Sequence, residues 1–181
     1  MKAFVFLADG FEEIEGLTVV DILRRAQIET ETVSVMKTKE ICGSHNITVF
    51  ADKLFEEIDT EKGMLFVLPG GMPGRLHLGA HEGLCALLKR ADAQKKKIAA
   101  ICAAPSVLGA LGILEGREAV CYPGFEEKLI GAKCGTHPVA VSGHVTTSRG
   151  MGTAIDFALE LVRQIKGEEA ARTLAEGIVY R

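Results

Sequence analysis

The sequence has no apolar run approaching the roughly 20 residues that a membrane-spanning helix needs. It also has no CxxC pair, so zinc and thioredoxin-like sites have no support. Basic residues are not in excess, and the formal net charge of −3 gives no electrostatic footprint for nucleic acid or an anionic membrane. A linker rich in Pro, Gly or Ser and an internal repeat are likewise missing. These absences favour an ordinary soluble globular protein.

What the chain does contain fits that class. It has 181 residues, 48% of them apolar, which predicts one domain over residues 1–181 with a real core. The beginning, MKAFVFLADGFEE, lacks the long apolar segment and cleavage site of a secretory signal. The five cysteines are an odd number, so at least one thiol stays free if pairing is internal. We therefore expect a cytoplasmic, reducing environment.

Short apolar segments alternate with longer amphipathic ones. The short segments predict strands over Ala3–Ala8, Thr30–Met36, Ile47–Phe50, Met64–Leu68, Ile98–Cys102, Val139–Val141 and Val145–Thr147. Apolar residues at three- and four-residue steps predict helices from Glu12 to Arg25 and over Gly83–Gln94, Pro105–Leu111, Thr153–Ile165 and Glu168–Ile178. This alternation predicts an α/β fold with a mostly parallel sheet covered on both faces.

In such a sheet, ligands bind in the crevice at the carboxyl ends of the strands. The segments that follow the predicted strands are therefore the candidates for a site. They are Asp9–Glu15, Pro69–Gly74, Cys102–Pro105 and Thr147–Gly152.

Cys102 is the first candidate. It ends a buried strand and is surrounded by small residues, which suit the tight strand-to-helix turn of a nucleophile elbow. Pro105 suits the first turn of the next helix. A thiol at the positive end of that helix is predicted to have a lowered pKa. The alternative is a structural cysteine in an apolar strand, and the local pattern alone favours that alternative slightly.

Glu15 is the second candidate. In the crevice, a buried Glu15 would have a raised pKa and would stay protonated, so it would donate a hydrogen bond to a thiolate. An exposed first-turn glutamate that only complements the helix dipole is the alternative, which spacing alone favours. The histidine and carboxylate spacing predicts no metal site.

Two glycine-containing segments could supply backbone donors or an anion contact. Gly70 and Gly71 follow a buried strand, and the amides of Gly71 and Ala103 could form an oxyanion hole. Arg149 could anchor an anion or close the crevice. A plain turn at the glycines and a capped helix start near Arg149 are the alternatives, and the second of these is favoured on the local pattern.

Taken together, four motifs resemble the ThiJ/PfpI family of the class I glutamine-amidotransferase-like superfamily. They are G-F-E-E-I-E (Gly10–Glu15), V-L-P-G-G (Val67–Gly71), A-A-I-C-A-A-P (Ala99–Pro105) and T-S-R-G-M-G-T-A-I-D-F-A (Thr147–Ala158). They occur in order over nearly the whole chain, and they reverse the preference for a structural Cys102. The resemblance is closest to the branch of bacterial YajL and the human parkinsonism-linked redox protein. It implies a flavodoxin-like three-layer sandwich that is usually homodimeric.

The resemblance also implies roles for single residues. Cys102 falls on the reactive cysteine and Glu15 on its protonated carboxyl partner, while Gly71 and Ala103 fall on the pocket amides. The protease-like branch has a His directly after the cysteine, where this chain has Ala103. Human-like members have a pocket His where this chain has Tyr122, so a Cys–His pair is not evident.

The resemblance implies a cysteine-dependent stress-response enzyme of the glutathione-independent glyoxalase or protein deglycase type. Its partners would be small carbonyl substrates or glycated protein adducts, with no metal or organic cofactor. Cys102 would attack an aldehyde carbon and Glu15 would shuttle a proton. The alternative is a non-enzymatic redox sensor or chaperone-like protein that acts through Cys102 oxidation. An intracellular cysteine peptidase or amidase is a third possibility, which the missing His disfavours.

Overall fold

A seven-stranded sheet forms the centre of the molecule in the computed structural model, which describes residues 1–180. Its strands lie in the order β10-β11-β7-β6-β1-β2-β5, and every neighbouring pair is parallel except β10 with β11. The bounds are β1 (Lys2–Leu7), β2 (Thr30–Ser34), β5 (Lys53–Leu54), β6 (Gly63–Leu68), β7 (Lys97–Ile101), β10 (Val139–Ser142) and β11 (Val145–Ser148).

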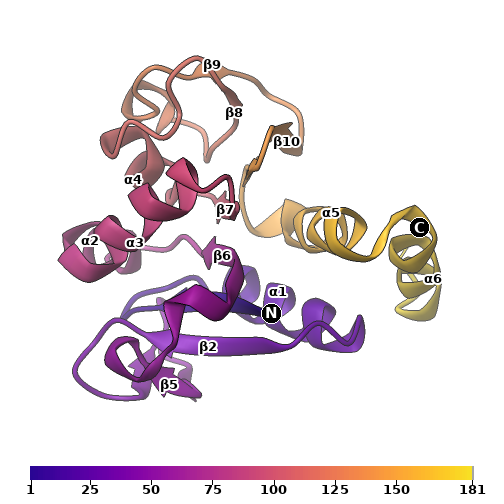
Figure 1. The fold of residues 1–181 in the computed structure, drawn as a ribbon, viewed down its shortest axis with the longest axis horizontal. Helices are drawn as coiled ribbons and strands as arrows, with labels where there is room; N and C mark the ends of the chain where they lie inside the picture. Colours follow the sequence, from indigo (N-terminus) through magenta and orange to yellow (C-terminus); the bar gives the residue numbers. More distant parts are fainter. Residues whose placement is uncertain (181) are drawn as a thin grey trace.

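Five of the six helices in residues 1–180 cover the two faces of this sheet, and the last helix packs against the one before it (Figure 1). The six helices are α1 (Glu13–Arg25), α2 (Gly74–Ala80), α3 (Glu82–Ala93), α4 (Pro105–Ala110), α5 (Ala154–Lys166) and α6 (Glu168–Gly177). Side chains alternate along β1: Phe4 and Phe6 pack in the core under α2, α3 and α4, whereas Val5 and Leu7 pack in the core under α1 and α5. The predicted flavodoxin-like, three-layer α/β sandwich is confirmed.

The smaller elements are the ones that the sequence patterns missed or placed only in part. The predicted strand at Ile47–Phe50 is β4 (Thr48–Phe50), which forms a hairpin with β3 (Glu40–Cys42) outside the main sheet. The sequence patterns did not predict the short helix α2 or the pair of strands formed by β8 (Glu118–Ala119) and β9 (Lys133–Cys134). They are too short for a clear periodicity, and two glycines lie in α2.

The chain order of the strands creates a crevice. β1 lies between β2 on one side and β6 on the other, so the connections leave β1 in opposite directions, and ligands bind at such a point. The segments after β1, β6 and β7 meet there, at the carboxyl ends of three adjacent strands. They carry Glu15, Gly70 and Cys102, respectively. Within residues 1–180, no helix has the length and apolar character to cross a bilayer.

Candidate active site

Cys102 occupies a strained turn between β7 and α4. Its φ angle is +65°, in the left-handed region that a non-glycine residue rarely adopts. Neighbouring backbone groups hold it there: its N–H donates to the Ser148 carbonyl (3.0 Å), and its carbonyl accepts from the Tyr122 N–H (2.9 Å). The small buried residues Ala103 and Ala104 let the chain double back into α4. The elbow predicted from the sequence is therefore the observed backbone geometry.

Glu15 lies against this turn from the first turn of α1. Its side chain is buried, with a residue exposure of 1%, and it makes a side-chain hydrogen bond with Cys102. The Gly70 N–H donates to its Oε2 (2.9 Å). A Cβ atom on Gly70 would lie 2.6 Å from the Cys102 Cβ and 2.7 Å from the Glu15 Oε2. Gly70 therefore provides the space in which thiol and carboxyl meet.

Two backbone amides point at the Cys102 sulfur. The N–H groups of Gly71 and Ala103 donate toward it, and both favour the thiolate. Gly71 has a φ of +96°, and a Cβ there would lie 2.4 Å from the Glu12 nitrogen and from the Gly10 oxygen. Only glycine fits at this position. The two predicted donors are thus arranged to stabilise negative charge at or next to the sulfur.

Burial dominates the titration of the pair. It raises the pKa of Glu15 to about 7, although hydrogen bonds from Cys102 and the Gly70 amide oppose the shift. Burial and the neighbouring Glu15 charge also raise the pKa of Cys102 to about 12. The predicted lowering of the thiol pKa is therefore wrong, because desolvation and the carboxylate outweigh the amide donors. Since the two groups interact, they titrate as a pair.

A pocket of about 390 Å³ opens above the sulfur. Of the residues predicted to form the site, Cys102, Glu15, Gly71, Ala103 and Tyr122 line it. Gly70 reaches the site through its amide, behind Glu15.

Arg149 is not brought into the pocket. Its Nη1 donates to the Thr136 carbonyl (2.9 Å), which directs the guanidinium away from the sulfur. The local pattern at Arg149 therefore identified the turn but not the direction of its side chain.

Sequence reasoning missed most of the apolar wall. The remaining lining residues are Glu12, His45, Met72, Phe125 and Met151. Met72 and Met151 are each about half exposed, at 49% and 52%. They follow the glycine turns after β6 and β11, so their proximity to a predicted strand end was the one signal that could have found them.

Glu12, Glu13 and His45 form a polar cluster at one side of the pocket. The His45 Nδ1 lies 3.0 Å from the Glu13 Oε2 and 3.6 Å from the Glu12 Oε2, and Ser44 Oγ bonds to both carboxylates. Burial opposes ionisation of Glu13, but hydrogen bonds from the side chain of His45 and from backbone amides lower its pKa to about 2. The hydrogen bond to Glu13 raises the pKa of His45. Histidine and carboxylates are metal-ligating groups, and their ligand atoms lie within 4.8 Å of one another.

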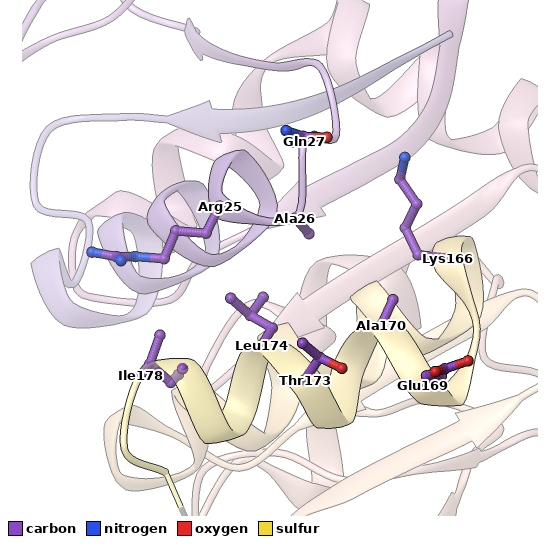
Figure 2. A pocket seen from close by; sticks show the side chains of 10 residues that line it. Arg25, Ala26, Gln27, Lys166, Glu169, Ala170, Thr173, Leu174 and Ile178 are labelled. Carbon is purple, nitrogen blue, oxygen red and sulfur yellow. The ribbon is translucent and has the colours of Figure 1, made fainter.

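A larger hollow lies elsewhere. It has a volume of about 820 Å³ between the end of α1 and the helix α6, and Figure 2 shows Arg25, Lys166 and Leu174 on its walls. It contains none of the residues predicted to form the site. Size alone would select this hollow, but the buried carboxyl, the strained cysteine and the amide donors are all at the smaller pocket. We therefore assign the candidate active site to the pocket above Cys102.

Fold and site together define a flavodoxin-like protein with a cysteine elbow, laid out as in the class I glutamine amidotransferases. A model of the DJ-1/PfpI family matches residues 1–164, and the chain belongs to that family.

Among the solved structures, oxidized DJ-1 of Toxoplasma gondii superposes with a TM-score of 0.95 at 39% identity, covering 99% of this chain and 98% of that one. Among curated proteins, the DJ-1 homolog B of Arabidopsis thaliana is 36% identical over 99% of this chain but 42% of its own length. This chain thus spans less than half of that relative. A protein of Pyrococcus abyssi named as a deglycase is 31% identical over 92% of this chain and 100% of its own.

Proposed function

We propose that this DJ-1-type stress-response protein is a cysteine-dependent enzyme acting on reactive dicarbonyls or their protein adducts. The observation that carries the proposal is the strained Cys102 elbow, with two amides aimed at its sulfur and the buried Glu15 beside it. The deglycase name of the Pyrococcus abyssi relative supports the same class of substrate. We expect this chemistry to need no metal or organic cofactor.

The first step is addition of the Cys102 sulfur to the aldehyde carbon of an α-oxoaldehyde, which gives a hemithioacetal. The new oxyanion accepts hydrogen bonds from the amides of Gly71 and Ala103 and takes the proton of the neutral Glu15, which leaves Glu15 as a carboxylate. The Glu15 carboxylate then removes the proton on the former aldehyde carbon, giving an enediol, and returns it to the neighbouring carbon. The resulting thioester is hydrolysed by water to a hydroxy acid and the free thiol, so no oxidant or reductant is consumed.

The pKa of Glu15, about 7, suits this double role, because a proton shuttle works best when its pKa lies near the working pH. Part of the rise in the Cys102 pKa comes from an ionised Glu15. When Glu15 holds the proton, that contribution disappears and the two amides still stabilise the thiolate. The reactive form is therefore a thiolate beside a neutral carboxyl.

The test is the conversion of methylglyoxal to lactate by the purified protein. We expect turnover by the natural chain and none by a Cys102→Ala variant that keeps its fold by circular dichroism. Turnover by the alanine variant at the natural rate would show that the mechanism is wrong.

We propose as the second candidate that Cys102 is a redox sensor in a stress-response or chaperone-like protein. The oxidised state of the Toxoplasma gondii relative and the amide donors around the sulfur favour it. Mild peroxide should add two oxygen atoms at Cys102 selectively, as measured by peptide mass spectrometry. Equal oxidation of all five cysteines would contradict a sensor role. Peptidase or amidase activity has less support, because His45 is the one histidine among the residues lining the pocket, and it bonds to carboxylates.

We further propose a homodimer, as the family structures suggest. The exposed apolar side chains of Ile14 and Leu17 on α1, at 49% and 36%, offer a surface for a second copy. Light scattering of the eluting protein should give twice the chain mass of 19.4 kDa. A single-chain mass at micromolar concentration would contradict it.

A further inference from the structure

Arg75 connects the two segments that carry the amide donors. It lies in the first turn of α2, and its backbone N–H donates to the carbonyl of Gly71 (3.0 Å). Its side chain reaches the other segment, because Nε donates to the hydroxyl of Ser106 in α4 (2.8 Å). One residue therefore contacts both the loop after β6 and the helix that follows the elbow.

Ser106 passes this contact on to the elbow. Its residue exposure is 3%, and its hydroxyl donates to the carbonyl of Ala103 (2.6 Å). A guanidinium only donates hydrogen bonds, so the single hydroxyl proton of Ser106 is left for the Ala103 carbonyl. The two hydrogen bonds therefore run in one direction: Arg75 donates to Ser106, and Ser106 donates to Ala103.

We propose that Arg75 is a positioning residue for the Cys102 site, acting through Gly71 on one side and through Ser106 and Ala103 on the other. The inference rests on the proposed function only in taking Cys102 as the reacting group. The amides of Gly71 and Ala103 face the sulfur and favour its thiolate. Loosening either segment lets an amide turn away, so a smaller fraction of Cys102 is thiolate at neutral pH and the thiol reacts more slowly.

The reaction of Cys102 with iodoacetamide, followed by peptide mass spectrometry from pH 6 to pH 10, tests this inference. Arg75→Met and Ser106→Ala should each slow alkylation roughly three- to tenfold at neutral pH and move its pH profile upward, since Arg75→Met loses the hydrogen bond to Ser106 and Ser106→Ala also loses the one to Ala103. Ser106→Thr keeps the hydroxyl and should react as the natural chain does. The exposed Arg172 of α6 supplies the matched control, Arg172→Met.

Cys85 supplies an internal control for general loosening. It lines a cavity of about 320 Å³ together with Arg75 and Ser106. If a substitution merely loosened the packing, Cys85 would be alkylated faster. A positioning role predicts slower alkylation of Cys102 with unchanged alkylation of Cys85. Faster alkylation of Cys85 in Arg75→Met would overturn the proposal.

A double variant tests whether Arg75 acts through Ser106. In the Ser106→Ala background, Arg75→Met should have no further effect, because no hydroxyl is left to receive the hydrogen bond of Arg75 and the backbone contact to Gly71 remains. If the two substitutions slow the alkylation of Cys102 additively, Arg75 does not act through Ser106. Alkylation needs no dicarbonyl substrate, so these results stand even if methylglyoxal is not converted. The two experiments therefore distinguish an absence of methylglyoxal turnover from a failure of the positioning role.

Discussion

Cys102 and Cys121 are two thiols of the same chain with opposite prospects, although burial raises the pKa of both. The values are about 12 for Cys102 and about 11 for Cys121, so ionisation alone does not single out Cys102. Cys121 is 3% exposed and belongs to the core that contains residues of α2, α3 and α4. Cys102 lies on a pocket, in a strained turn, with two amides and Glu15 at its sulfur. Access and directed donors, rather than the resting pKa, distinguish a reactive thiol.

The largest effect should come from exchanging each thiol for a hydroxyl. We expect Cys102→Ser to lower the kcat/KM for methylglyoxal by roughly a thousandfold or more, because a serine hydroxyl is a much weaker nucleophile without an adjacent base. Cys121→Ser should stay within about twofold, since the sulfur takes no part in the reaction. Lactate formation measures both. Equal losses would erase the difference between the two thiols.

Gly70→Ala should have the next largest effect. The added methyl group would lie 2.6 Å from the Cys102 Cβ and 2.7 Å from the Glu15 Oε2, so the pair must move apart. A displacement of this size should lower kcat/KM by about a hundredfold. Gly152→Ala is the matched control, because a Cβ there meets no atom within 4 Å. A Gly70→Ala variant as active as the control would show that the contact between thiol and carboxyl is dispensable.

These residues also show how far the sequence led. The Cys102 turn and Glu15 were predictable because Cys102 directly follows β7, Glu15 lies in the helix after β1, and each belongs to a motif. The wall formed by Met72, Phe125 and Met151 was not, because it depends on how three loops fold over the pocket.

Two further features could not be predicted from the sequence, for physical reasons. The contact of Arg75 with Ser106 joins residues 31 positions apart on two short helices, one of which shows no clear periodicity. The sign of the Cys102 pKa shift was predicted wrongly because a helix dipole is visible in the sequence, whereas the depth of burial is not.

The difference between Cys102 and Cys121 depends on pH, because Glu15 beside Cys102 is titratable. Its pKa rises from 4.5 in the unfolded chain to about 7 in the folded one. Below about pH 4.5 the group is neutral in both states, and above about pH 7 it is charged in both, so folding carries the cost of a buried charge at the higher pH. The free energy of unfolding should therefore fall, relative to that of Glu15→Gln, as pH rises through this window. At 1.36 kcal/mol per unit, the difference is at most about 3 kcal/mol.

Urea unfolding of both proteins at pH 5 and pH 8 measures this difference. Glu82→Gln, at an exposed position of α3, provides a control for charge removal. If the difference in the free energy of unfolding between the natural chain and Glu15→Gln does not change with pH, Glu15 keeps an ordinary pKa. The carboxyl would then be ionised throughout the neutral range and unable to donate a proton to the substrate.

The smallest effect concerns Tyr122, which the resemblance between the motifs aligns with the pocket histidine of human-like members. Its backbone N–H holds the Cys102 carbonyl at 2.9 Å, and its ring packs over Gly150 while remaining 50% exposed. Tyr122→Phe keeps both contacts and removes the hydroxyl alone, so kcat/KM should change by less than about twofold. A loss of tenfold or more would instead make the hydroxyl an acid–base group in the reaction. Cys102 would then differ from Cys121 in having the Tyr122 hydroxyl as a reacting group, in addition to the two amides and the Glu15 carboxyl.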